Sequence, residues 1–290
     1  MLLENLPSVS QVIVSIAVML LAGYLMSRVT KMLKLPNVTG YIVAGIIIGP
    51  YCLKIIPTGV AQGMSFLADI ALAFIAFSTG EFFKLSTLKK NGGKNIVITV
   101  FEALLASILV FFVMYFALKM SLAFSIVLAS LAAATAPAST MMTIRQTGAH
   151  GDFVDTLLQV VALDDVVGLV AFSVAIAVAT ASLSGQITAK NILLPIVYNL
   201  VAFVVGGVLG FILKLLISNR SSDNRLIIAV AIIFTFCGIC TFMDVSPLLG
   251  CMAMGTVYRN ASGDDKLFKQ LNYFTPPILL LFFVRSGVNF

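Results

Sequence analysis

Ten apolar stretches, each about as long as a helix that crosses a lipid bilayer, follow one another along this chain of 290 residues. Short polar loops separate the stretches, which cover residues 11–27, 39–56, 63–83, 95–118, 121–143, 154–182, 191–217, 226–243, 246–258 and 274–290. Lipid offers no partner to an open sheet edge, and the strand-period alternation of a membrane barrel is missing. The sequence therefore predicts an all-α, polytopic membrane protein, with residues 1–290 in a single transmembrane domain.

Composition agrees with this prediction, because 60% of the residues are hydrophobic and only 10% are charged. The first stretch follows Glu4 rather than a basic segment and is followed directly by Arg28, so it is expected to be a retained helix and not a signal peptide. Cys237-Gly-Ile-Cys240 resembles a redox or metal motif only in its spacing. With no second pair and no nearby histidine, we interpret these cysteines as packing residues.

The basic residues alternate between successive loops and so predict the orientation of the chain. The three in the poorer loops are Lys54, Lys119 and Lys190. The fourteen in the richer loops are Arg28, Lys31, Lys34, Lys84, Lys89, Lys90, Lys94, Arg145, Lys214, Arg220, Arg225, Arg259, Lys266 and Lys269. The positive-inside rule places these fourteen in the cytoplasm and the N-terminus outside. The net charge of +6 then reflects topology, and no nucleic-acid partner is expected.

An internal repeat links the two ends of the chain. The second stretch carries Pro36, Gly40 and Gly45, and the ninth carries Pro247, Gly250 and Gly255. The third and tenth stretches align through Ser78 and Ser286. The predicted topology runs the related helices in opposite directions, and inverted repeats of this kind build secondary transporters. Partners of the fifth and sixth stretches would fall beyond residue 290, so further C-terminal helices are expected in a complete repeat.

Two adjacent carboxylates interrupt the sixth stretch, where Asp164 and Asp165 are expected about ten residues from either lipid face. Even mild scales put a carboxylate at the bilayer centre at about 2.5 to 3.5 kcal/mol, so the pair needs compensation. Neighbouring helix positions point about 100° apart, so one acid can hold an ion while the other meets a partner. A carboxylate that exchanges its proton for a metal ion, here a monovalent cation, is the minimal machinery of an antiporter.

The fifth stretch contains Ala134-Thr-Ala-Pro-Ala-Ser-Thr-Met141 and is expected to be a discontinuous helix near Pro137. Proline removes a backbone donor and breaks the bond to the carbonyl of Ala133. Interrupted helices expose backbone groups to ions in transporters, although a simple kink is the alternative. We expect Thr135 and Ser139 to be ion ligands, supported by Ala136, Pro137 and Thr140.

Other ionisable residues lie in or near apolar stretches, and of these Asp69 is expected to be structural. Glu81 is close to the cytoplasmic lysines and either pairs with them or supports the ion site. Glu102 is expected to be structural, and Arg285 is available to neutralise one of the acids. His150, in a polar loop, is more simply a solvated histidine than a pH sensor.

Four segments together resemble the monovalent cation/proton antiporter superfamily. They are Leu35-Pro-Asn-Val-Thr-Gly-Tyr-Ile-Val-Ala-Gly-Ile-Ile-Ile-Gly-Pro50, Thr135-Ala-Pro137, Leu163-Asp-Asp165 and Leu281-Phe-Phe-Val-Arg-Ser-Gly287. The chain is most similar to the branch with bacterial sodium/proton antiporters and glutathione-gated potassium efflux systems. It departs from that pattern at Thr79-Gly80-Glu81, where relatives usually have Gly-Leu-Glu, and at Arg285.

The resemblance implies a division of labour. Residues 60–185 would form most of an ion-binding core, and residues 1–58 and 190–258 most of a scaffold through which two copies form a homodimer. Asp165 would carry the ion or proton, and Asp164 would pair with a lysine beyond residue 290 in relatives. The double aspartate favours sodium over potassium.

These observations predict a transporter, not an enzyme, in the cell membrane. It would exchange monovalent cations, most simply sodium, for protons by alternating access, without a cofactor. Potassium/proton exchange or efflux, and a sodium/solute symporter of similar fold, remain alternatives. An intramembrane aspartyl protease is disfavoured, because its two acids must face one water from different helices.

Overall fold

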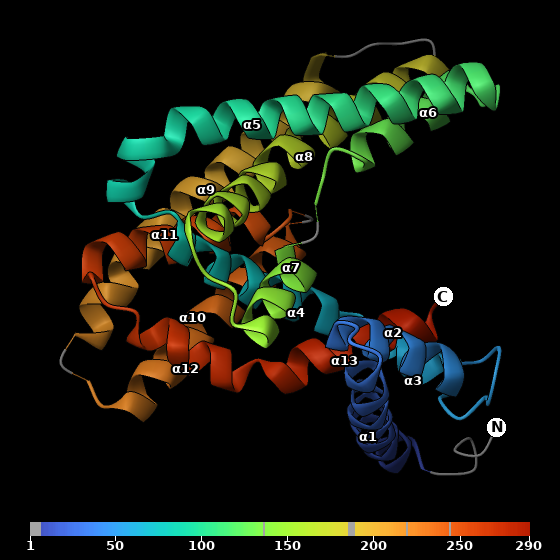
Figure 1. The fold of residues 1–290 in the computed structure, drawn as a ribbon, viewed down its shortest axis with the longest axis vertical. Helices are drawn as coiled ribbons and strands as arrows, with labels where there is room; N and C mark the ends of the chain where they lie inside the picture. The colour runs from blue at the N-terminus through green and yellow to red at the C-terminus, as the bar shows by residue number, and fades with distance from the viewer. Residues whose placement is uncertain (1–6, 136, 185–188, 219, 244) are drawn as a thin grey trace. The chain divides into compact units, whose positions relative to one another are not determined.

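The computed structural model describes residues 7–135, 137–184, 189–218, 220–243 and 245–290, and over these residues the chain is helical, without a β-strand (Figure 1). In chain order the elements are α1 (Ser8–Met32), α2 (Asn37–Ile48), α3 (Thr58–Gly63), α4 (Phe66–Thr79), the 3-10 helix η1 (Gly80–Phe82), α5 (Leu85–Phe112), the π-helix η2 (Val113–Ala117), α6 (Leu122–Leu131), α7 (Pro137–Thr147), α8 (Asp152–Ser184), α9 (Ala189–Ile217), α10 (Ser222–Phe242), α11 (Leu248–Ser262), α12 (Lys266–Phe274) and α13 (Pro276–Val288). The all-α prediction is confirmed.

The apolar stretches do not all become full-length spans. Among the described residues, four helices are long and apolar enough to cross a membrane: Ser8–Met32, Gly93–Ala117, Val197–Ile217 and Ser222–Phe242. The bent pair α12 and α13, with 47° between its halves, makes a fifth candidate. In contrast, α2 has 12 residues and α6 has 10, which is too short to cross alone. Hydropathy detects apolar length but not where a helix stops.

Prolines explain several of the helix starts. Pro7, Pro36 and Pro57 directly precede α1, α2 and α3, and Pro247 directly precedes α11. Proline has no backbone N–H to donate, so the position costs nothing at a helix start but is disruptive inside one. The two repeat-related helices α2 and α11 therefore both directly follow a proline, although the backbone is extended at Pro36 and helical at Pro247.

The chain divides into two compact units. The first comprises Met1–Ile75, Ala138–Ala149 and Lys266–Phe290, and the second comprises Ala76–Pro137 and His150–Asp265. Each is described by itself below as unit 1 and unit 2. The predicted division into an ion-binding core at 60–185 and a dimer scaffold at 1–58 and 190–258 stays a prediction.

Unit 1 is organised around the contacts of α2 with α1 and α13. Its main apolar cluster consists of Met19, Ala44, Ile48, Ile56, Val60, Ala61, Met64, Leu281, Val284 and Val288. A Cβ on Gly45 would overlap the carbonyl oxygen of Val284, and a Cβ on Gly287 would overlap that of Ile42. Small residues let two membrane helices approach closely enough for backbone contact. The α2–α13 crossing therefore depends on this pair of glycines.

Unit 2 contains a second crossing of the same kind, where the end of α4 and η1 meet α11. A Cβ on Gly255 would overlap the carbonyl oxygen of Phe77, and a Cβ on Gly80 would lie 2.6 Å from the carbonyl oxygen of Met252. Also in unit 2, Gly206 on α9 meets the backbone of Gly250 on α11 just as closely. The glycines that the repeat singles out are therefore contact residues of the fold.

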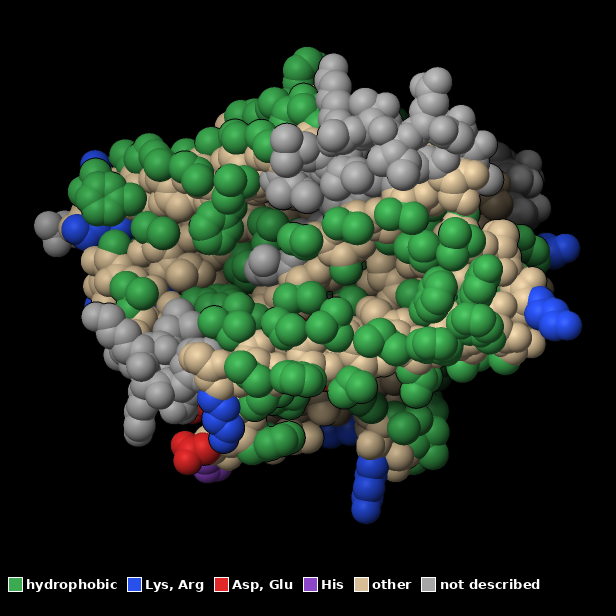
Figure 2. All heavy atoms as spheres, turned by 90° about the horizontal axis from the view of Figure 1, so that it is seen from above, with side chains coloured by type: hydrophobic (Ala, Val, Ile, Leu, Met, Phe, Trp, Pro, Cys, Tyr) green, Lys and Arg blue, Asp and Glu red, His purple; other side chains and the backbone are tan. Residues whose placement is uncertain are grey.

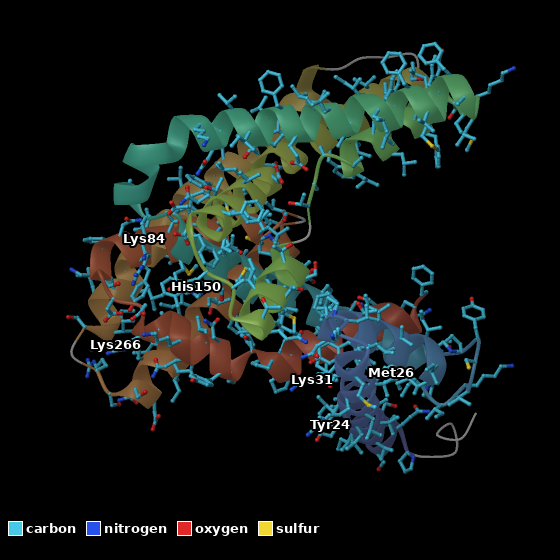
Figure 3. The ribbon with its side chains drawn as sticks, in the orientation of Figure 1. Tyr24, Met26, Lys31, Lys84, His150 and Lys266 are labelled. Atoms are coloured by element: carbon cyan, nitrogen blue, oxygen red, sulfur yellow. The ribbon has the colours of Figure 1, made fainter. Side chains whose placement is uncertain are left out.

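Several basic side chains of the described residues lie at helix ends. Figure 2 shows a face covered mostly by hydrophobic side chains, with Lys and Arg side chains towards its margins. Figure 3 labels three lysines at helix ends: Lys31 near the end of α1, Lys84 just before α5, and Lys266 at the start of α12. This distribution fits helices whose middles face lipid and whose ends face water.

Candidate functional site

The helix predicted over 121–143 is interrupted. Helix α6 ends at Leu131, and α7 begins at Pro137; residues 132 and 133 form a turn and residues 134 and 135 are irregular. Within the turn, the N–H groups of Ala133 and Ala134 donate to the carbonyls of Ser130 and Leu131. The interruption is confirmed, but Pro137 starts a new helix instead of bending a continuous one. Ala136 lies outside the described residues, so its supporting role stays a prediction.

Small residues bring this break against α8. A Cβ on Gly168 would lie 3.0 Å from the Cβ of Ala134, so the contact leaves no room for a larger side chain on α8. Gly168 stands four residues after Asp164, which places the two on the same face of α8. The contact therefore places the irregular backbone at Ala134 against the face of α8 that carries Asp164.

Asp164 is the centre of the arrangement that the structure describes. Its side chain is fully buried, with 0% exposure. The hydroxyl of Thr135 donates a hydrogen bond to Asp164 Oδ2 at 2.8 Å, whereas Oδ1 is buried and has no hydrogen-bond partner among the described groups. A buried anion with half of its acceptors unpaired is costly. The site therefore favours a proton or a cation on this carboxyl group.

Glu102, which the sequence reasoning treated as structural, lies close enough to interact with Asp164 across the packed helices α5 and α8. The sequence carried a signal for it. Asn95, Thr99 and Glu102 follow the i, i+4, i+7 spacing that puts three polar residues on one face of α5. Glu102 therefore brings a second carboxyl group next to Asp164.

The structure reaches the remaining predicted site residues only in part. Asp165 follows Asp164 on α8, but its side chain lies outside the described ones, so its role as the carrier stays a prediction. Ser139 and Thr140 lie on α7, in residues that group with unit 1 rather than with Asp164. Glu81 lies in η1, half-buried. Their parts in an ion site remain predictions.

Arg285 has a partner within unit 1 that sequence reasoning did not suggest. Its Nε donates to the backbone carbonyl of Ala61 at 2.8 Å. The expectation that an acid would neutralise it is not tested by this contact. A guanidinium directed at a carbonyl ties the end of α13 to α3.

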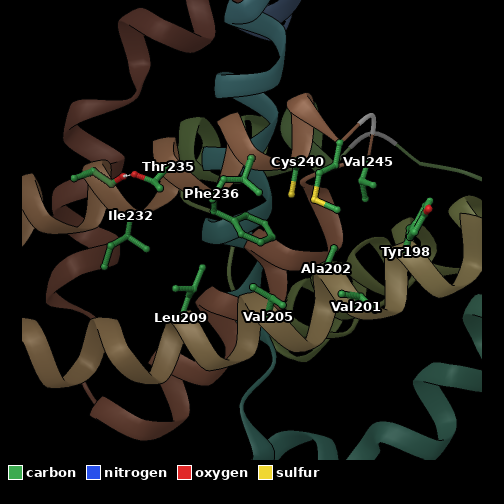
Figure 4. Close-up of a pocket in the computed structure, with 13 residues that line it drawn as sticks. Tyr198, Val201, Ala202, Val205, Leu209, Ile232, Thr235, Phe236, Cys240 and Val245 are labelled. Carbon is green, nitrogen blue, oxygen red and sulfur yellow. Dashed lines mark hydrogen bonds between the residues drawn. The ribbon is translucent and has the colours of Figure 1, made fainter.

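A cavity of about 400 Å³ between α9 and α10 shows no features of an ion site (Figure 4). Its walls include Tyr198, Phe236 and Cys240, and none of the described residues that line it carries a charge. The hydroxyl of Thr235 donates to the carbonyl of Ala231, within its own helix. All four cysteines are free thiols, and the Cys237 and Cys240 side chains are buried in α10. Nothing in this cavity would hold a cation as Asp164 could.

Comparison with known proteins gives one family match. The model of the family described as "Sodium/hydrogen exchanger, transmembrane" matches residues 16–290. Among solved structures, the sodium proton antiporter MjNhaP1 from Methanocaldococcus jannaschii, determined at pH 8, is similar with a TM-score of 0.72 and 23% identity over 97% of this chain and 70% of that one. At that identity the likeness concerns the fold. No match was found among curated proteins.

Proposed function

The chain belongs to the family of transmembrane sodium/hydrogen exchangers, and from this we propose that it exchanges sodium ions for protons across the cell membrane at Asp164 and Asp165. The observation that carries the proposal is the state of the Asp164 carboxyl group. It is fully buried, it accepts one hydrogen bond from Thr135, and its second oxygen is unpaired.

Competition for one carboxyl group accounts for exchange. A buried carboxylate is unstable without a compensating charge, so the group carries either a proton or a cation. Binding of one therefore requires release of the other. The Thr135 hydroxyl accommodates both states, because its bond to Oδ2 leaves its own lone pairs free to face a cation. The carboxyl pair Asp164 and Asp165 forms the site in this proposal: the family resemblance gives Asp165 the role of carrier, and Asp164, held by Thr135, is the buried partner beside it.

The interrupted helix supports the same function. Backbone between α6 and α7 that is not in a helix offers oxygens to a small, hard cation, which a continuous helix would not. We propose that this segment supplies further ligands, with Ser139 added when the cation is bound. The protein would work as a homodimer with its N-terminus outside the cell, following the loop charges and the resemblance described above.

The test is cation-driven proton movement in proteoliposomes, followed with an internal pH dye. Sodium should release protons from the protein as it is, and Asp164→Asn and Asp165→Asn should each abolish the release. Asp152→Asn is the matched control, since Asp152 is an exposed residue in the first turn of the same helix.

Each outcome leads to a different conclusion. Release by potassium but not sodium would turn the proposal to potassium/proton exchange. Sodium uptake without proton movement would favour a sodium/solute symporter. Sodium-driven proton release that persists in both variants would show that exchange requires neither aspartate.

A further inference from the structure

The cavity between α9 and α10 is long and narrow. In Figure 4, Leu209 and Ile232 lie at one end and Tyr198 and Val245 at the other. Tyr198 and Leu209 are eleven residues apart on α9, which is a rise of about 16 Å. Over that length, the volume of about 400 Å³ corresponds to a mean cross-section of about 25 Å². The cavity is therefore a slot between two helices, and we refer to it below as the α9–α10 slot.

The packing of α9 and α10 on α11 accounts for the slot. A Cβ on Gly206 of α9 would overlap the carbonyl oxygen of Gly250 on α11, and a Cβ on Gly250 would overlap the ring of Phe236 on α10. Both helices therefore contact α11 closely around Gly250. Phe236 and Ala202 are buried there and line the slot. Small residues at these contacts bring the backbones together and leave space between α9 and α10.

One side of the α9–α10 slot is exposed. Val201, Val205 and Ile239 line it and are 52%, 43% and 54% exposed. Val197–Ile217 and Ser222–Phe242 are two of the four segments that are long and apolar enough to cross a membrane. The medium that reaches the exposed side is therefore the hydrocarbon of the bilayer.

Chemistry and size limit what the slot can hold. Its described walls carry no charge, and the Thr235 hydroxyl already donates within its own helix, so water has few polar partners there. A helix of a second copy is about 10 Å across with its side chains and is too wide to enter. An extended peptide would bring backbone N–H and C=O groups without partners. A hydrocarbon chain is narrow, has no polar group, and contacts the walls at about 4 Å between carbon atoms.

We propose that the α9–α10 slot binds one acyl chain of a membrane lipid, which enters from the exposed side at Val201, Val205 and Ile239. The apolar segments begin at Val197 and end at Phe242, so the Tyr198 end of the slot is near the membrane surface and the Leu209 end is deeper. The lipid headgroup lies at the Tyr198 end, at the depth where tyrosine is enriched in membrane proteins. The bound chain supplies contacts that α9 and α10 do not make with each other.

A photoreactive lipid tests the site directly. The probe is a phosphatidylcholine with a diazirine near the end of one acyl chain, bound to the purified protein in detergent and washed before irradiation. We expect residues 198–209 and 231–245 to carry at least about fivefold more label than Gly93–Ala117, because binding sites of this kind are few in a protein. Gly93–Ala117 is the matched control, since it is another apolar segment long enough to span and is largely exposed. Equal labelling of the three segments would overturn the proposal.

Filling the slot with a side chain tests the same site independently. Val205→Phe adds a ring from α9, and Thr235→Phe adds one from α10 in case the first variant does not fold. Val204→Phe is the matched control, because Val204 is 57% exposed on the same helix and lies outside the lining of the slot. Phospholipid that remains bound after detergent washing, measured by native mass spectrometry, should fall at least about fivefold in the two slot variants and not in the control. Equal retention in all of them would contradict the proposal.

Thermal unfolding then separates a bound lipid from a contact with a second copy. Added phosphatidylcholine should raise the unfolding temperature of the delipidated parent and of Val204→Phe by about 3 °C, and that of Val205→Phe by much less. Loss of a dimer in Val205→Phe with unchanged lipid retention would assign this surface to a second copy and overturn the proposal. No step depends on ion exchange, so failure of the proposed function would leave the lipid site standing.

Discussion

The two glycine crossings of this protein are built alike but are secured differently. In unit 1, α2 meets α13 through Gly45 and Gly287; in unit 2, the end of α4 and η1 meet α11 through Gly80 and Gly255. Each crossing joins one helix from each half of the repeat. The glycines therefore specify which helices touch, and they do so without any functional chemistry.

The polar group beside each crossing is where they differ. Near the unit 2 crossing, Asn260 donates to the carbonyl of Phe83 and accepts from the N–H of Leu85, so that a neutral amide uses both of its ends. Near the unit 1 crossing, Arg285 donates from Nε to the carbonyl of Ala61. Both side chains secure non-helical or terminal backbone. Asp164, by contrast, has an oxygen without a hydrogen-bond partner among the described groups. This oxygen is therefore available to a proton or cation that binds and is released.

The largest expected effect comes from filling either crossing. Gly45→Ala and Gly255→Ala should each destabilise the protein by about 3 kcal/mol, because the added Cβ overlaps a backbone oxygen that cannot move aside cheaply. Thermal unfolding in detergent measures this. Gly238→Ala is the control: it lies inside α10 with nothing within 4 Å of an added Cβ, and it should be neutral or stabilising. Equal stability of the three variants would show that the close helix contacts at Gly45 and Gly255 do not stabilise the fold.

Removing the Asn260 amide should have the next largest effect on stability. Asn260→Leu leaves the Phe83 carbonyl and the Leu85 N–H without their partner and should cost about 2 kcal/mol of stability. The same unfolding measurement applies, with Asn260→Asp as a comparison that keeps the acceptor for Leu85 but loses the donor to Phe83. A leucine variant as stable as the parent would show that water replaces both bonds.

At the ion site, Thr135→Val should change binding more than folding. Losing the hydroxyl next to Asp164 should raise the sodium concentration for half-maximal exchange about tenfold, equivalent to about 1.4 kcal/mol. Thr241→Val is a matched control, because the Thr241 hydroxyl donates to the carbonyl of Cys237 in its own helix. Similar sodium dependence in both variants would argue against Thr135 as a ligand.

The smallest effect on stability is expected when Arg285 is replaced. Arg285→Met should cost about 1 kcal/mol, since the lost bond to Ala61 is partly offset by no longer burying a charge. Exchange should be retained if this residue only secures α13. Loss of exchange in a protein of near-normal stability would instead give Arg285 a part in the ion site, as the sequence first allowed.

Parts of the site were visible in the sequence because burial in lipid makes certain residues conspicuous. A proline in a long apolar run predicts an interrupted helix, which the non-helical residues 132–135 confirm. The aspartate pair amid apolar residues predicts an ion site; Asp164 is buried, and its role in ion binding stays a prediction. Glu102 was missed because one acid near the middle of a helix does not reveal which neighbour it faces. The hydrogen bond from Asn95 to Gln159 was also not predicted, because the two residues are 64 positions apart in the chain.

Helix ends were the weakest part of the prediction. The amphipathic helix α12 was not expected, and α2 and α6 proved shorter than the apolar runs that contain them. Hydropathy averages over a window, whereas a helix ends where local backbone chemistry or a close contact requires it. The bounds of spans therefore depend on packing as well as on composition.

The sequence by itself determined that the chain is an all-helical membrane protein with an internal repeat and a carboxylate pair. Apolar length, loop charge and residue spacing are local properties of the sequence. They determine directly which segments partition into lipid and which into water. Only the tertiary structure decided that Gly45 meets Gly287, that Arg285 binds the carbonyl of Ala61, and that Thr135 and Glu102 lie beside Asp164. Such partners are far apart in the chain, and the free energy that selects them arises only when the helices pack.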